Sequence, residues 1–341
     1  MTRRPGSPKA LACFLRGLAL SLSKPYLAVA LWLMQLMLAA VLILPIGNTM
    51  HALLDRSPSG EKMVAVPDYG WWETVRRTHS DVLGNFPEFA TGLLSPEGIK
   101  WSEIPGMRGV GATAFALALL AIVLHAFALG GTLGTLKEPS ASLVTFGKEG
   151  MRYMPAFLLF TFPAWGAAFA AYQWIYVGSG EALRHRVRGL HTELAALAVT
   201  GLRLAATLVV LAAIKLLADA VRTVWVARRD LPPVSRFLFG IGGAVARPLR
   251  LFGILGMYAV TTAALYAIWL VADPSAGGEA RFALVPLILT QQLFVFVRLL
   301  IKVGYYAGIS EALTRAPSPE YSYVAGAAPA PAESPEPPVP V

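Results

Sequence analysis

The sequence predicts an all-α, polytopic membrane protein with about six transmembrane helices. Of its 341 residues, 56% are hydrophobic and only 14% are charged, whereas a soluble protein usually carries about 25% charged residues. Apolar runs of about 18 or more residues, long enough to cross a ~30 Å hydrocarbon core, occur about six times. They are Tyr26–Leu44, Val110–Leu133, Pro155–Val177, a run within Leu194–Val226, Leu251–Val271 and Phe282–Val303.

These spans define one membrane domain, residues 26–312, with a long outer loop at 50–109. Residues 1–25 form a cytoplasmic amino terminus with an interfacial helix. The first span is predicted to stay uncleaved, because its apolar stretch exceeds the 7–15 residues of a secretory signal. Residues 313–341 are rich in Pro and Ala and too poor in bulky apolar residues to fold, which predicts a disordered cytoplasmic tail.

The distribution of Lys and Arg predicts that both ends lie in the cytoplasm. Basic residues gather before the first span, after the second and after the fourth, as they do on cytoplasmic sides. The outer loop holds eight acidic against six basic residues. The third loop fits least well, because it would place Arg184, Arg186 and Arg188 outside. The net charge of +9 indicates contacts with membrane lipids rather than with nucleic acid, because the Lys and Arg residues lie beside the spans.

A short motif predicts an internal repeat of three units, each an amphipathic interfacial helix followed by two spans. Phe14, Leu15 and Gly17 precede Lys24-Pro25, and the same spacing recurs later in the chain, with a looser copy between. The later copies are Phe237, Leu238, Gly240 and Arg247-Pro248, and then Phe146, Gly150 and Pro155. The interfacial helices are expected at Lys9–Ser23, Leu143–Tyr153 and Ser235–Ala246. The alternative to a repeat is that Phe, basic residues and Pro are common in any loop that enters a membrane.

Ionisable side chains within the spans are the first place to seek function, because each costs about 2.5–3.5 kcal/mol to insert. Five of them fall at one level when counted back from the prolines that end each unit: His125, Lys215, Asp219, Arg298 and Lys302. We expect them to form a polar layer in which the Asp219 carboxylate pairs with Lys215, one turn away, and with Arg298 of a neighbouring helix. This layer is either a substrate or proton site, or an ion pair that only fixes helix packing.

Other motifs indicate packing rather than chemistry. Gly130 with Gly134, and Gly304 with Gly308, have the small-xxx-small spacing that lets helices approach closely. No Walker loop, His-Glu-x-x-His pair, Gly-x-Ser-x-Gly elbow or Cys–His metal spacing is present. The sequence therefore predicts no enzyme, no cofactor and no metal site.

Three features of the sequence point to a known group of proteins. They are the interfacial motifs at Phe14, Phe146 and Phe237, the six spans, and the run Asp219-Ala-Val-Arg222 leading to Arg228-Arg229-Asp230. Over residues 10–312 the chain resembles a broad group of uncharacterised bacterial six-span membrane proteins, which implies location in a bacterial inner (cytoplasmic) membrane. The group includes proteins similar to the membrane domain that accompanies glycerophosphoryl diester phosphodiesterases. These 341 residues contain no counterpart of that hydrolase domain, so the resemblance implies no catalysis.

Two functions from different classes remain open. One is a non-catalytic scaffold or accessory subunit that binds lipids, a protein partner or a second copy of the chain. The other is a small-solute transporter whose path includes the Asp219 layer. A transporter should have a cavity between spans that reaches this layer, whereas a scaffold should be filled there. Trp71 and Trp72 in the outer loop are either a recognition lid or anchors at the membrane surface.

Overall fold

The computed structural model describes residues 9–54, 107–138, 142–180, 193–272 and 280–314. Over these residues the chain is helical and contains no strand, which confirms the all-α prediction. Most of the outer loop, the tryptophans in it, the arginines of the third loop and the tail at 315–341 lie outside the described residues.

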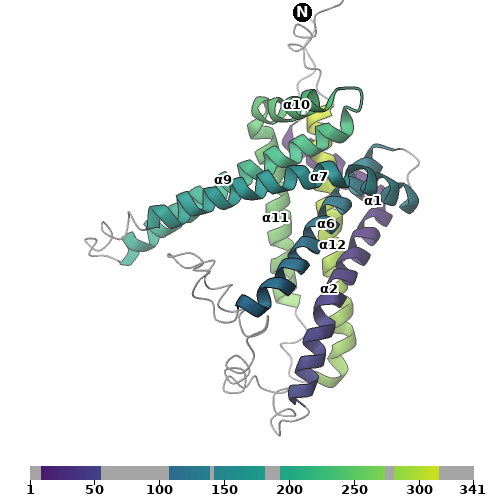
Figure 1. The fold of residues 1–341 in the computed structure, drawn as a ribbon, viewed down its shortest axis with the longest axis vertical. Coiled ribbons are helices and arrows are strands. Elements are labelled where there is room, and N and C mark those ends of the chain that lie inside the picture. Colours follow the sequence, from purple (N-terminus) through teal and green to yellow (C-terminus); the bar gives the residue numbers. More distant parts are fainter. Residues whose placement is uncertain (1–8, 55–106, 139–141, 181–192, 273–279, 315–341) are drawn as a thin grey trace, which may run out of the picture.

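The helices form a bundle (Figure 1). In chain order they are α1 (Ala10–Ser23), α2 (Pro25–Leu54), α6 (Met107–Lys137), α7 (Leu143–Ala171), the π-helical segment η1 (Tyr172–Gly178), α9 (Glu193–Ala227), α10 (Pro233–Ala246), α11 (Pro248–Ala272) and α12 (Ala280–Thr314). Each predicted span lies inside one of these helices, or inside α7 and η1 together.

Five to six helices are long and apolar enough to cross a membrane within the described residues. The sixth is the bent pair of α1 and α2, whose axes meet at 78°. With 30 residues α2 is about 45 Å long, enough to span by itself. The bend therefore leaves α1 outside the span, across the end of the bundle.

Short helices cross the bundle end at two of the three predicted positions, α1 and α10. Each ends at a basic residue followed by proline, and both basic residues leave the helical conformation in nearly the same way. Lys24 has φ −127° and ψ 57°, and Arg247 has φ −136° and ψ 46°. Proline disfavours the α conformation of the residue before it. The base-proline pairs thus produce the breaks before α2 and α11.

The third predicted interfacial helix, Leu143–Tyr153, is not separate. It forms the first part of α7, which continues through Pro155 and Pro163 without ending. Met154 stands where the other copies have a base, and the copy is two residues shorter. A helix can continue through an internal proline when neighbouring groups compensate for the lost N–H. The Ser142 hydroxyl and Thr145 cap the start of α7 reciprocally.

Glycines bring three pairs of helices into close contact, α1 with α12, α7 with α6, and α10 with α9. A Cβ atom added to Gly17 would lie 2.6 Å from the backbone nitrogen of Gly308. One added to Gly240 would lie 2.6 Å from Cα of Val221, and one added to Gly134 2.5 Å from Cβ of Glu149. Each element with the Phe and Gly motif thus packs on the end of another unit's second span.

The packing glycines predicted from the sequence lie in these contacts. Gly130 faces Tyr153 and the backbone of α7, Gly304 faces Leu18, and Gly308 faces the backbone of α1 at Cys13. Close backbone approach of this kind is how small residues associate helices in lipid.

Basic side chains satisfy the carbonyl groups at the ends of the same three spans. Lys24 Nζ donates to the carbonyls of Thr135 and Glu138 at the end of α6, at 3.0 and 2.6 Å. Arg247 Nη1 donates at 2.9 Å to the Ala312 carbonyl in α12. Lys137 Nζ donates at 2.8 Å to the carbonyl of Ala227, the last residue of α9. The final carbonyls of a helix have no partner inside it, so these contacts complete the helix ends.

We expect Gly17→Ala to lower the free energy of unfolding by about 1–3 kcal/mol, because the added methyl group collides with backbone atoms of α12. Thermal unfolding in detergent measures the change.

The matched control is Gly166→Ala in α7, where an added Cβ has no atom within 4 Å. That variant should be neutral or more stable by up to about 1 kcal/mol. Equal stability of the two variants would contradict the packing role of Gly17.

Candidate functional site

The Asp219 carboxylate on α9 is the centre of a buried polar network. Its side chain is 1% exposed, and Lys215 and Arg222 lie on the same face of the helix at spacings of four and three residues. Lys215 Nζ lies 2.6 Å from Oδ2, and Arg222 Nη1 lies 3.4 Å from Oδ1. Two cations on one helix therefore flank one carboxylate.

Two further hydrogen bonds connect this network to the neighbouring helices. The Tyr305 hydroxyl of α12 donates to Asp219 Oδ2 at 2.9 Å, and Arg222 Nη2 donates to the Thr161 hydroxyl of α7 at 2.9 Å. Asp219 and Arg222 thereby join α7, α9 and α12. The Arg222 Nε atom is buried and has no hydrogen-bond partner in the described part of the chain.

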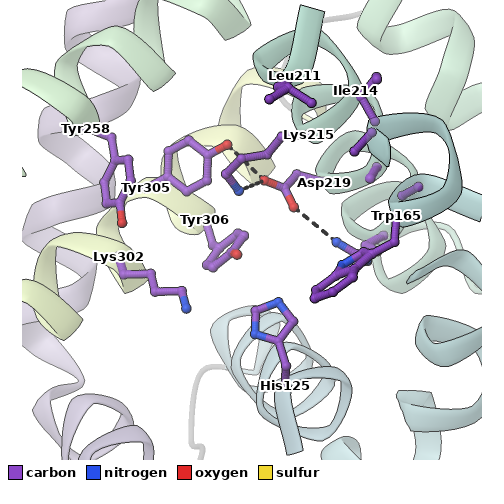
Figure 2. Close-up of a pocket in the computed structure, with 14 residues that line it drawn as sticks. His125, Trp165, Leu211, Ile214, Lys215, Asp219, Tyr258, Lys302, Tyr305 and Tyr306 are labelled. Carbon is purple, nitrogen blue, oxygen red and sulfur yellow. Dashed lines mark hydrogen bonds and ion pairs between the residues drawn. The ribbon is translucent and has the colours of Figure 1, made fainter. Parts of the chain in front are cut away.

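A cavity of about 400 Å³ opens beside the network. Its wall comes from α6, α7, α9, α11 and α12, and its volume is within the ~300–1,000 Å³ typical of small-molecule sites. Figure 2 shows the His125 ring, the Lys302 ammonium and the Tyr306 ring turned toward its centre. Side chains from helices far apart in sequence therefore face one space.

The structure brings together four of the five residues of the predicted polar layer: His125, Lys215, Asp219 and Lys302 all line this cavity. Arg298 does not, and its predicted pairing with Asp219 is wrong. Arg298 precedes Tyr305 by seven residues, about 10 Å along α12, so its guanidinium cannot reach the carboxylate. It donates instead to the Tyr266 hydroxyl at 3.1 Å.

The sequence predicted Lys215 as a partner of Asp219 but missed Arg222 and Tyr305, and with them Thr161, the partner of Arg222. Arg222 follows Asp219 by three residues, a spacing that places both side chains on one face of the helix, so the run Asp219-Ala-Val-Arg222 held a signal for this pair. Tyr305 and Thr161 gave no signal, because aromatic and hydroxyl side chains occur in many spans. A second buried carboxylate was also missed. Glu149 in α7 lies 2.6 Å from Arg229 Nη2, near the end of α6.

Positive charge exceeds negative charge around the cavity. Lys215, Arg222 and Lys302 are cationic and Asp219 is the only acid in its lining, which leaves two positive charges uncompensated. Lys302 forms neither a hydrogen bond nor an ion pair with any residue that the structure describes. Uncompensated charge inside a membrane is costly and marks ligand pathways or sites. The arrangement is therefore suited to binding an anion.

Apolar side chains line the same cavity beside the charged ones. Trp165 of α7 is 64% exposed on the surface of the protein, and Leu211 and Ile214 of α9 also line the space. Exposed apolar residues continue along both helices, at Leu159, Phe162, Leu208 and Val209. A ligand entering between these helices would meet this apolar surface together with the Lys215 side chain, which is 42% exposed.

No protein-family model, curated protein or solved structure matches this chain. The resemblance to membrane domains that accompany glycerophosphoryl diester phosphodiesterases therefore stays a prediction.

We expect Asp219→Asn to lower the free energy of unfolding by about 3–5 kcal/mol, because it leaves the buried Arg222 guanidinium without a counter-charge. Lys215 contributes less to this loss, since its side chain is 42% exposed. Chemical unfolding in detergent measures the change.

Arg298→Gln is the comparison, because among the described residues Arg298 forms only an exposed hydrogen bond to Tyr266. It should change the stability by less than about 0.5 kcal/mol. A loss of stability as large as that of Asp219→Asn would show that Arg298 shares in the network.

Proposed function

We propose that this chain is a non-catalytic integral membrane protein, a scaffold or accessory subunit, whose polar pocket binds the head of an anionic lipid. The observation that carries the proposal is the excess of two positive charges in a cavity of about 400 Å³. A scaffold without a ligand would be filled with side chains around Asp219, whereas the structure has a cavity there. A lipid head supplies the anion, and the apolar entrance accommodates its chains.

The depth of the pocket supports a lipid head over a solute in mid-membrane. Val221 of α9 lies against the glycine of α10, and Gly304 of α12 lies against α1. Asp219 and Lys302 are each two residues from these contacts, about 3 Å along their helices. If α1 and α10 lie in the headgroup plane, as their mixed composition predicts, the pocket is just below that plane. Transporter sites are typically near the bilayer midplane.

A small-solute transporter is the second candidate, favoured by the same cavity because it reaches the Asp219 layer between the spans. We further propose that the protein spans the bacterial inner membrane, as the resemblance implies, with both ends in the cytoplasm, as the distribution of basic residues predicts. The pocket then belongs to the cytoplasmic leaflet. A protein partner or a second copy would bind elsewhere on the surface.

The proposal predicts that anionic lipid stays bound when the protein is purified from nanodiscs of mixed phosphatidylethanolamine and phosphatidylglycerol. Native mass spectrometry of wild type should show bound phosphatidylglycerol above its share of the bilayer. Lys302→Gln should reduce this enrichment at least about fivefold, because the free ammonium in the pocket is lost.

The control is Arg298→Gln, which removes one positive charge from the adjacent turn of the same helix but outside the cavity. It should keep the enrichment. Equal lipid retention by the two variants would overturn the proposal, and uptake of a small anion by proteoliposomes that Lys302→Gln abolishes would favour the transporter.

A further inference from the structure

We infer that the pocket selects a phosphate monoester, the doubly charged form of phosphate, over phosphodiesters and carboxylates. This inference rests on the proposed function, because it names the ligand class of that same site. The experiment distinguishes failure of this inference from failure of the proposed function.

The charge balance of the pocket favours a doubly charged anion. Asp219 already accepts hydrogen bonds from Lys215, Arg222 and Tyr305, so its negative charge is used within the protein. The lining still holds two more positive charges than negative ones. A carboxylate or a phosphodiester brings one negative charge and leaves one cation uncompensated. A phosphate monoester brings about −1.5 to −2 at pH 7 and neutralises both.

The hydrogen-bonding groups that line the pocket also favour a phosphate monoester. Lys302 points its ammonium group into the cavity from α12, and Tyr258 of α11 and Tyr306 of α12 line the same cavity (Figure 2). His125 faces these groups from α6. Ammonium and phenol groups donate hydrogen bonds, whereas the lining contains one carboxylate as acceptor and that carboxylate is already hydrogen-bonded. A donor-rich space of this kind suits the three terminal oxygens of a monoester better than the two free oxygens of a diester.

The position of Lys215 lets it contact a ligand at the edge of the cavity. Its ammonium bonds to Asp219 on one side and lies over the rings of Tyr305 and Tyr306, at 5.0 and 5.7 Å from their centroids. These contacts hold the ammonium at the edge of the cavity with part of its surface still accessible. Lys215 is therefore positioned to contact a ligand without leaving Asp219, and Lys302 supplies the second cation.

The source of the monoester is either a lipid, such as phosphatidic acid, or a soluble molecule, such as glycerol phosphate. Both offer the same group to the pocket. The apolar entrance at Trp165 and Leu211 favours the lipid, and the experiment separates the two sources.

The test measures competition for wild-type protein in nanodiscs that contain phosphatidic acid, phosphatidylglycerol and a fatty acid in equal amounts, read by native mass spectrometry. At pH 8 we expect phosphatidic acid to be bound at least tenfold over each of the other two. The preference over phosphatidylglycerol should decrease several-fold at pH 5, because a monoester takes up its second proton near pH 6 and becomes singly charged like the diester.

The titratable groups around the ligand act in different directions. Those lining the cavity are His125 from α6, Lys215, Asp219 and Arg222 from α9, Tyr258 from α11, and Lys302, Tyr305 and Tyr306 from α12, with none from α7. The expected loss of preference between pH 8 and pH 5 comes from the ligand and not from these side chains. His125→Gln, which removes the imidazole from the lining, should therefore keep that loss.

Lys302→Gln should bind phosphatidic acid and phosphatidylglycerol about equally, and Lys302→Arg should restore the preference. Equal binding of the lipids by wild type at pH 8 would overturn the inference but leave anionic lipid binding intact. Binding of soluble glycerol phosphate at pH 8, sensitive to Lys302→Gln and with no lipid retained, would uphold the inference and reject lipid binding as the function.

Discussion

A carboxylate buried in a membrane protein needs positive charge and hydrogen-bond donors around it, and this requirement at Asp219 organises the site. Arg222 meets it from the same helix and passes the connection on to Thr161 of α7. Tyr305 meets it from α12. Three helices are thus held at one level, and the cations that they place there exceed the charge they neutralise. The network is both a packing device and one wall of a binding pocket.

Around this site the helix ends are closed in a regular way. Glycines let α1, the start of α7 and α10 lie directly on the ends of α12, α6 and α9. Lysine and arginine side chains then bond to the carbonyls that those ends leave free. Because α1 is at the beginning of the chain and α12 near its end, their contact closes the arrangement. The ion pair of Arg16 with Glu311, at 2.7 Å, joins the same two helices.

The sequence was sufficient for the spans, for α1 and α10, and for the level of the polar residues, because hydropathy and helical spacing are local properties. It was sufficient for Lys215, the partner of Asp219 one turn away, but not for Tyr305 on another helix. Counting from prolines placed Arg298 and Lys302 in one layer, although they differ by one helical turn, about 6 Å along α12. Only the packing of α12 on α9 decides that Tyr305, rather than Arg298, reaches the carboxylate. Glu149 was missed for the same reason, since its partner Arg229 is 80 residues away.

The pocket lies where the regular pattern is interrupted. At Lys24 and Arg247 a base before proline ends the short helix and turns the chain into the following span. Position 154 is Met, and α7 continues through Pro155 as one helix. In Figure 1, α9 runs obliquely to α11 and α12. The continuous α7 supplies Ala164, Trp165 and Ala168 to one wall of the cavity, and His125, Asp219 and Lys302 line it from α6, α9 and α12. The helix that departs from the regular pattern is therefore also a wall of the pocket.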